Sequence, residues 1–139
     1  MKGKVVLLVD GENISYRRAG EICALGRRLG KVALVRVYHR QKDPATRPWT
    51  LTALQYGFQD ICLYGEARKN KVDEKLMRDA RKYAGQTEIG TICVASSDSD
   101  FAALSTPLRE SGKRLCFFGE AKAPERLRRA GRKFVQLGS

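Results

Sequence analysis

The feature that most constrains the fold of this chain is a regular alternation of short apolar runs with longer segments of helical period. The first run, V-V-L-L-V at residues 5–9, contains no polar residue, as expected for a strand that is covered on both faces. Further runs of strand length lie at residues 32–38, 61–64, 92–95, 114–118 and 134–137. The alternation predicts an α/β domain with a central, mostly parallel sheet of five to six strands and helices on both faces.

Helical segments separate these runs. The longer ones are expected at residues 15–29 and 72–84, with another that starts within residues 97–100 and a last short one at residues 124–130. We expect Pro107 to kink or divide the helix that starts within residues 97–100, because proline lacks a backbone donor.

A shorter helix is predicted after the polar loop at residues 39–48. Thr46, with Pro48 just inside the first turn, marks its start. The core-facing stripe of this helix is expected to consist of Leu51, Leu54 and Phe58. The single histidine of the chain, His39, falls in the preceding loop and is expected to be a surface residue rather than a ligand or a base.

Size and composition limit the class of protein. The 139 residues are enough for one domain, residues 1–139, and too few for two of ordinary size. No segment is long and apolar enough to cross a bilayer, and the start of the chain lacks the pattern of a secretory signal, so we expect a cytoplasmic protein without a membrane partner. The four cysteines form no C-x-x-C pair and are expected to be reduced core residues.

The net charge of +12 arises from 27 Lys and Arg against 15 Asp and Glu. Cations are concentrated at residues 68–71, 78–82 and 122–133, among other places. Such a field attracts polyanions, above all nucleic acid, because each neutralised phosphate releases counterions. The alternative is a basic surface that serves only solubility, and the size of the excess favours a polyanionic partner.

Two acidic motifs interrupt this basic chain directly after predicted strands. D-G-E-N, residues 10–13, follows the first apolar run, and S-S-D-S-D, residues 96–100, follows the fourth. In open α/β sheets ligands bind at the carboxyl ends of the strands. If the strand order is 3-2-1-4-5, Asp10 and Asp98 face each other about 4.8 Å apart, and they repel unless a cation lies between them.

A third acid comes from the helix predicted at residues 72–84, which starts at the same edge of the sheet. Asp73 lies in its first turn, whereas Asp79 is displaced by about 9 Å along the helix. We therefore expect Asp73 near Asp10 and treat Asp79 as a supporting residue outside the centre.

Each of these acids also has a structural interpretation as a turn residue or a helix cap. Caps do not require that the acids of a basic protein gather at one edge of its sheet, which favours a site. Clustered oxygen ligands without His or Cys suit Mg²⁺ or Mn²⁺ rather than Zn²⁺.

Three motifs of the chain follow the order and spacing of a known family. They are V-D-G-E-N-I (residues 9–14), K-N-K-V-D-E-K-L-M-R-D-A (residues 69–80) and A-S-S-D-S-D-F (residues 95–101). Together they resemble the NYN domain family, in the LabA-like branch of the PIN-like metal-dependent nucleases. The resemblance implies a PIN-like three-layer sandwich and a nuclease, most simply an endoribonuclease, that hydrolyses phosphodiester bonds of RNA at an acidic Mg²⁺ or Mn²⁺ pocket.

The resemblance also implies roles for single residues. Metal-binding carboxylates are expected at Asp10, Asp73, Asp98 and Asp100, with a supporting asparagine at Asn13. We expect Asp10 and Asp98 to hold the principal ion, while Asp73 and Asp100 complete its shell or hold a second ion. Asp79 and Ser96 are expected to support these ligands from outside.

Candidate substrate contacts lie near the same edge. The cations expected to meet the RNA backbone are Lys69, Lys71, Arg17 and Arg18. Tyr16, in a polar neighbourhood, is the preferred candidate for stacking on a base.

Two other functions compete with the nuclease. One is an RNA-binding module that retains the fold but cuts nothing, and the other is a phosphohydrolase of small esters. The second is disfavoured because D-G-E-N lacks an aspartate two residues after Asp10 and because a small anion does not need a charge of +12. DNA as a substrate and a homodimer stay open.

Overall fold

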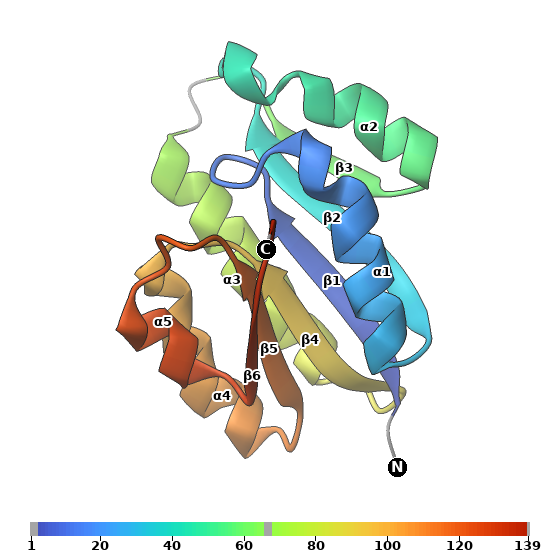
Figure 1. Ribbon diagram of the computed structural model, residues 1–139, viewed down its shortest axis with the longest axis vertical. Coiled ribbons are helices and arrows are strands. Elements are labelled where there is room, and N and C mark those ends of the chain that lie inside the picture. Colours follow the sequence, from blue (N-terminus) through green and yellow to red (C-terminus); the bar gives the residue numbers. More distant parts are fainter. Residues whose placement is uncertain (1–2, 66–67, 139) are drawn as a thin grey trace.

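The computed structural model describes residues 3–65 and 68–138 (Figure 1). Its centre is one six-stranded sheet with the order β3-β2-β1-β4-β5-β6, in which every neighbouring pair is parallel. The strands are β1 (Lys4–Asp10), β2 (Val32–Arg40), β3 (Gln59–Leu63), β4 (Ile89–Ala95), β5 (Arg114–Gly119) and β6 (Lys133–Gln136). This confirms the predicted α/β class, the parallel sheet and the expected neighbourhood of the first and fourth strands.

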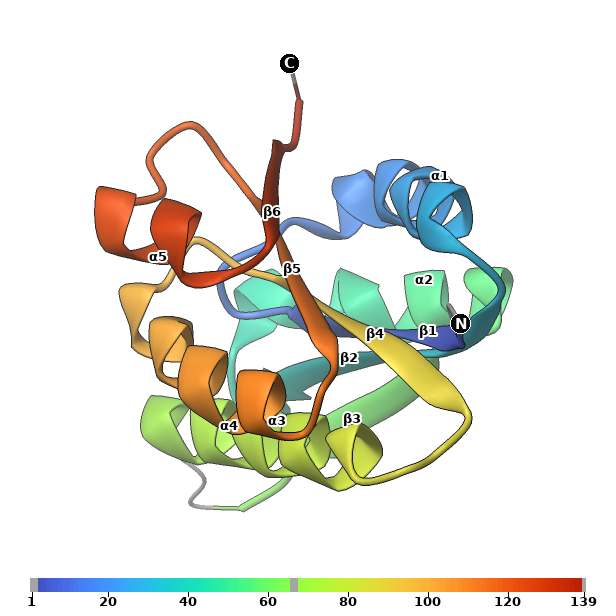
Figure 2. The ribbon, with the colours of Figure 1, turned by 90° about the horizontal axis from the view of Figure 1, so that it is seen from below.

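Helices cover both faces of the sheet and make a three-layer sandwich (Figure 2). One face carries the 3₁₀ turns η1 (Tyr16–Arg18) and η2 (Pro44–Thr46) with α1 (Ala19–Leu29) and α2 (Pro48–Tyr56). The other carries α3 (Lys69–Ala84), η3 (Ser99–Leu104), α4 (Ser105–Glu110) and α5 (Glu125–Ala130). None of the helices in the described segments has the length and apolar composition that a membrane span requires.

Strand β1 lies at the middle of the fold, bonded to β2 on one side and to β4 on the other. Val6 and Leu8 point into the core beneath α3, whereas Val5, Leu7 and Val9 point into the core beneath α1 and α2. Because both faces are covered, every position of the run is buried and a polar side chain here would lose its water.

The expected surface position of His39 is wrong. Strand β2 continues to Arg40, two residues beyond the predicted end, and His39 is only 1% exposed. Its ring nitrogens contact the Asp60 carboxylate at 2.6 Å and the Thr46 hydroxyl at 3.2 Å. These two partners satisfy the imidazole, so the residue is buried between β3 and the η2 turn.

The predicted core stripe of α2 is also wrong, apart from Phe58. Leu51 and Leu54 are 61% and 79% exposed. The buried side of the helix consists instead of Trp49, Thr52 and Ala53. The Trp49 indole donates to the carbonyl oxygen of Ile14 at 2.8 Å. With Trp49 on the buried side of the helix, both leucines point outward.

The predicted division of the fourth helix is present, but it lies before Pro107. A 3₁₀ segment, η3, ends at Leu104 and α4 begins at Ser105. Pro107 therefore lies in the first turn of α4, where a backbone donor has no helical partner to lose.

The cysteines are free thiols, as expected. Cys93 and Cys116 are buried at paired positions of β4 and β5, and Cys23 and Cys62 are half-buried.

The two leucine environments predict opposite outcomes for the same substitution. Leu76 of α3 is 0% exposed, so Leu76→Ala should lower the free energy of unfolding by about 2–5 kcal/mol. Leu54→Ala, at a position that is 79% exposed, should change it by less than about 0.5 kcal/mol. Urea denaturation of both variants measures the difference, and equal losses would contradict the orientation of α2.

Candidate metal centre

Three carboxylates meet at the carboxyl edge of the sheet. Asp98 and Asp100 follow β4 in the turn that opens η3, and Asp73 lies in the first turns of α3. Each offers an oxygen atom, and these three atoms lie within 4.8 Å of one another. Asp73 is buried, Asp98 is half-buried and Asp100 is exposed, so the group opens to solvent on one side.

Asp10, the last residue of β1, is completely buried beside this group. Its carboxylate accepts hydrogen bonds from the Asn13 amide at 2.6 Å, the Ser96 hydroxyl at 2.8 Å and the backbone N–H of Glu12 at 3.2 Å. Burial raises the pKa of Asp10 above its ordinary value, the three hydrogen bonds oppose that rise, and the charge of Asp98 adds to it.

The expected pairing of Asp10 with Asp98 stays a prediction, and the charge of Asp98 acts on Asp10. Among the described residues, the group of carboxylate oxygens within 4.8 Å of one another consists of Asp73, Asp98 and Asp100 and does not include Asp10. One oxygen of Asp10 accepts hydrogen bonds from both Asn13 and Ser96.

Ser96 connects the ends of β1 and β4. Its hydroxyl donates to Asp10 and accepts the backbone N–H of Asp98 at 3.0 Å. Asp98 in turn caps η3 by accepting the backbone N–H of Asp100 at 2.9 Å. A continuous chain of hydrogen bonds thus runs from the buried Asp10 to the exposed Asp100 and fixes the turn that carries two of the three grouped acids.

The turn after β1 is held equally tightly. The backbone N–H groups of Asn13 and Ile14 donate to the Asp10 carbonyl at 3.1 and 2.9 Å. A Cβ atom at Gly11 would come within 2.9 Å of the Tyr38 carbonyl oxygen and 3.1 Å of the Trp49 ring. Only glycine therefore allows the chain to pass this close to β2 without displacement.

Glu12 is a part of this turn that sequence reasoning missed. Its side chain is 1% exposed and forms an ion pair with Arg40 at the end of β2. The strand pairing explains the contact, because Asp10 pairs with Tyr38 and Arg40, two residues after Tyr38, therefore lies near the turn that follows Asp10. The pair ties the turn after β1 to the neighbouring strand.

The expected substrate contacts have different surroundings. Arg17 lies over the ring of Tyr16 at 5.1 Å, and both line a hollow of about 230 Å³ that also includes Gly11 and Asn13. Arg18 contacts Glu21 at 3.6 Å, and the exposed Lys71 contacts Glu74 at 3.5 Å. The side chain of Lys69, at the start of α3, lies outside the described part of the structure.

The donor set of the acidic group fits a hard divalent cation. All three donors are carboxylate oxygens, and no histidine or cysteine among the described residues joins them. Such a set suits Mg²⁺ or Mn²⁺ rather than Zn²⁺. Three like charges at this spacing repel one another, and a bound cation removes that repulsion.

Comparison of the sequence with models of known protein families identifies the family of the chain. Its sequence matches the NYN domain over residues 4–138. The chain belongs to the NYN domain family. Domains of this family have a PIN-like nuclease fold, with which the six-stranded parallel sheet agrees, and they are generally nucleases. Among the curated proteins, none matches the chain.

Asp79 of this NYN domain lies apart from the acidic group. It accepts hydrogen bonds from the Tyr38 hydroxyl at 2.6 Å, the Arg36 guanidinium at 2.9 Å and the Lys75 ammonium at 3.2 Å. Burial alone would raise the pKa of Asp79, but these donors outweigh it and hold the pKa below its ordinary value. The geometry gives Asp79 a structural role between α3 and β2.

The depressed pKa of Asp79 predicts a pH-dependent contribution to stability. Above the unfolded-state pKa of about 3.9 the contribution is complete, and it is lost as the pH falls through the lower folded-state pKa. At pH 7, Asp79→Asn should lower the free energy of unfolding by about 2–3 kcal/mol, because a buried charged acceptor is lost. The deficit should shrink below about pH 4.

Urea titrations across pH 2–8 measure this effect. The exposed Glu110 of α4 provides a matched control, and Glu110→Gln should leave the curve unchanged. A deficit of Asp79→Asn that stays constant down to pH 2 would rule out the ionised carboxylate as its source.

Proposed function

We propose that this NYN domain is a Mg²⁺- or Mn²⁺-dependent endoribonuclease that hydrolyses phosphodiester bonds of RNA. The observation that carries the proposal is the group formed by Asp73, Asp98 and Asp100, whose oxygens lie within 4.8 Å of one another in a chain of net charge +12. A basic chain that concentrates three acids at one point fits the combination of a polyanionic substrate and a metal that lies between substrate and protein.

The ligands proposed for the metal are the three grouped acids. When bound, a divalent ion supplies Lewis-acid activation of water and neutralises charge on the phosphate. Asp73, on a helix that packs against the sheet, gives the group its buried and rigid member. Asp98 and Asp100 share one capped turn, so their separation is set by the backbone of that turn.

Asp10, Asn13 and Ser96 are proposed to position these ligands. Asp10 is buried and accepts three hydrogen bonds, and its charge acts on Asp98. Because Ser96 bonds both Asp10 and the Asp98 backbone, loss of either partner would loosen the turn that carries the acids.

The rim of the site supports recognition of a nucleic-acid strand. Arg17 and Tyr16 line the hollow next to the turn after β1, where a guanidinium can meet a phosphate and a ring can meet a base. Lys71 extends the positive rim along the first turn of α3. The alternative is an RNA-binding module without catalysis, which uses the same rim but not the acids.

Metal binding should be visible in thermal stability. At a Mn²⁺ concentration tenfold above its Kd, the domain should gain about 1.4 kcal/mol, which is a rise in Tm of about 4 °C. In Asp98→Asn the gain should largely disappear, while the metal-free Tm should not fall, since one like charge has been removed. Glu110→Gln should respond to Mn²⁺ like the wild type. An unchanged gain in Asp98→Asn would place the metal elsewhere.

Cleavage tests the proposed reaction itself. A circular single-stranded RNA, which offers no ends to an exonuclease, should be opened only when Mg²⁺ or Mn²⁺ is present. Asp98→Asn should slow this cleavage by at least about a hundredfold and leave RNA affinity within about twofold. A DNA circle of the same sequence serves as the second substrate. Cleavage that survives Asp98→Asn would contradict the assignment, and RNA binding without any cleavage would favour the binding module.

A further inference from the structure

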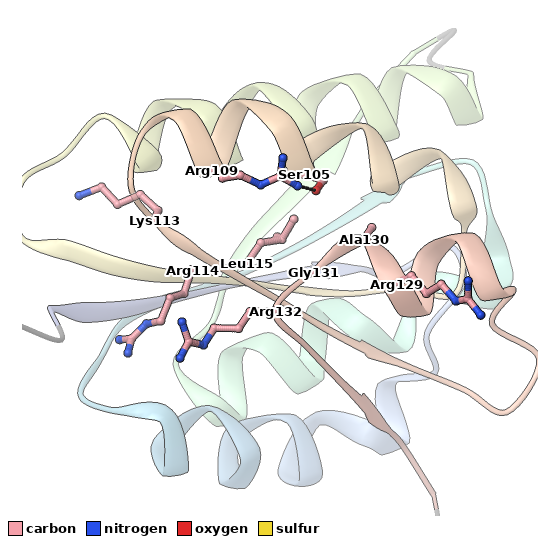
Figure 3. A pocket seen from close by; sticks show the side chains of 9 residues that line it. All are labelled: Ser105, Arg109, Lys113, Arg114, Leu115, Arg129, Ala130, Gly131 and Arg132. Carbon is pink, nitrogen blue, oxygen red and sulfur yellow. Dashed lines mark hydrogen bonds between the residues drawn. The ribbon is translucent and has the colours of Figure 1, made fainter.

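A second charged region lies at the opposite edge of the sheet, where β5 and β6 begin. Two hollows of about 300 and 270 Å³ open there and share Arg114 and Arg132. Figure 3 shows the side chains that line the first. The first lies against α4 and α5, and the second reaches Leu29 of α1. The side chains that give this region its charge, here called the basic edge, are Arg109, Lys113, Arg114, Arg129, Arg132 and Lys133.

The basic edge contains no compensating acid in its lining. Among the described residues, neither hollow is lined by an aspartate or a glutamate. Arg129 contacts Glu125 at 3.0 Å, but both side chains are mostly exposed, and such a pair is weak in water. Neighbouring cations such as Arg114 and Arg132 (Figure 3) repel each other, and a bound polyanion relieves that repulsion.

Several of these cations are fixed by contacts with the protein. The Lys113 ammonium donates to the carbonyl oxygens of Gln86 and Ile89 at 3.0 and 2.6 Å, and Nε of Arg114 donates to the Thr91 hydroxyl at 2.9 Å. The guanidinium groups of Arg114 and Arg132 extend in the same direction (Figure 3). A guanidinium group that is already held, as that of Arg114 is, loses little side-chain entropy when it binds an anion.

The thiol of Cys116 lies within the field of these cations. Cys116 lines the second hollow beside Lys133. A hydrogen bond from Cys93 is the main reason that the pKa of Cys116 is lowered; burial opposes it, and the charges of Lys133, Arg114 and Arg132 lower it further. The same cations that line the hollow thus stabilise negative charge within it.

We propose that the basic edge is a second RNA-binding surface that holds backbone phosphates far from the acidic group. The inference rests on the proposed function for the identity of the polymer. No aromatic side chain lines either hollow in the described part of the chain, so the surface offers charge without base stacking. Binding there is therefore independent of sequence and sensitive to salt.

The separation of the two edges sets a length requirement for the RNA. The six residues of β5 span about 20 Å at about 3.3 Å per residue. A stacked strand rises about 3.4 Å per nucleotide, so about six stacked nucleotides match this distance, and the RNA must in addition pass around the protein surface between the edges. A 5-nucleotide RNA contacts one edge at a time, whereas a 25-nucleotide RNA reaches both and gains the affinity of a second, linked contact.

The test measures RNA affinity by fluorescence anisotropy in EDTA, so that catalysis plays no part. The variant is Arg132→Gln with Lys133→Gln, both at exposed positions, and the control is Arg28→Gln with Arg81→Gln, exposed arginines of α1 and α3 that remove the same charge. For the 25-nucleotide RNA, the variant should lose about tenfold in affinity and about 1.4 in the slope of log Kd against log salt, and the control much less.

The length series and a competitor complete the design. The ratio of 25-nucleotide to 5-nucleotide affinity should fall in the variant and stay unchanged in the control. Equal losses in variant and control, or no loss in either, would overturn the proposal. So would tripolyphosphate binding that is lost in the variant while RNA affinity persists, because the hollows would then serve small polyphosphates.

Two further results keep the outcome clear. Arg109→Gln with Lys133→Gln should reproduce the affinity loss, which makes a local folding defect of one variant insufficient as an explanation. RNA affinity that depends on the basic edge in a protein that cleaves nothing would leave this inference standing and overturn the nuclease. Metal-dependent cleavage, together with normal RNA affinity in both variants of the basic edge, would leave the nuclease standing and overturn this inference.

Discussion

The hydrogen bond from the Ser96 hydroxyl to the Asp10 carboxylate is the contact on which the candidate site depends. It joins the ends of two parallel strands and brings a buried charge into contact with the turn that carries Asp98. A buried carboxylate is costly unless donors surround it, and Asn13 and the Glu12 backbone supply the others. The turn that carries Asp98 and Asp100 is therefore held in place by a buried carboxylate whose hydrogen bonds are already made.

This arrangement assigns two roles to different carboxylates: one holds the turn in place, and the others offer oxygen atoms to a cation. A residue that accepts three hydrogen bonds is rigid, but its lone pairs are largely used. Asp73, Asp98 and Asp100 leave an opening to solvent, and their mutual repulsion is what makes a divalent cation favourable there. The repulsion among the three grouped acids and the hydrogen bonds around Asp10 thus belong to one connected site.

Sequence reasoning predicted the features that follow from period and chain order. An apolar run such as residues 5–9 is readable because both of its faces are buried, and the position of D-G-E-N and S-S-D-S-D after strands placed both motifs at one edge. It failed where a long-range contact decides the outcome. The indole of Trp49 donates to the Ile14 carbonyl on the buried side of α2, and Leu54 is therefore exposed. His39 is buried in contact with Asp60 on the neighbouring strand. The basic edge was missed for a related reason, because Arg114 and Arg132 meet only through strand pairing.

A sheet in which every strand runs the same way has two chemically different ends. Here the carboxyl ends carry the acidic group, and the amino ends of β5 and β6 carry the arginines of the basic edge. The acidic group and the basic edge therefore contribute charges of opposite sign at the two ends of the strands, in addition to the net charge. An approaching polyanion experiences a torque as well as an attraction, so the basic end tends to turn toward it before contact. Strand direction, fixed by folding, thereby influences the orientation of the first encounter.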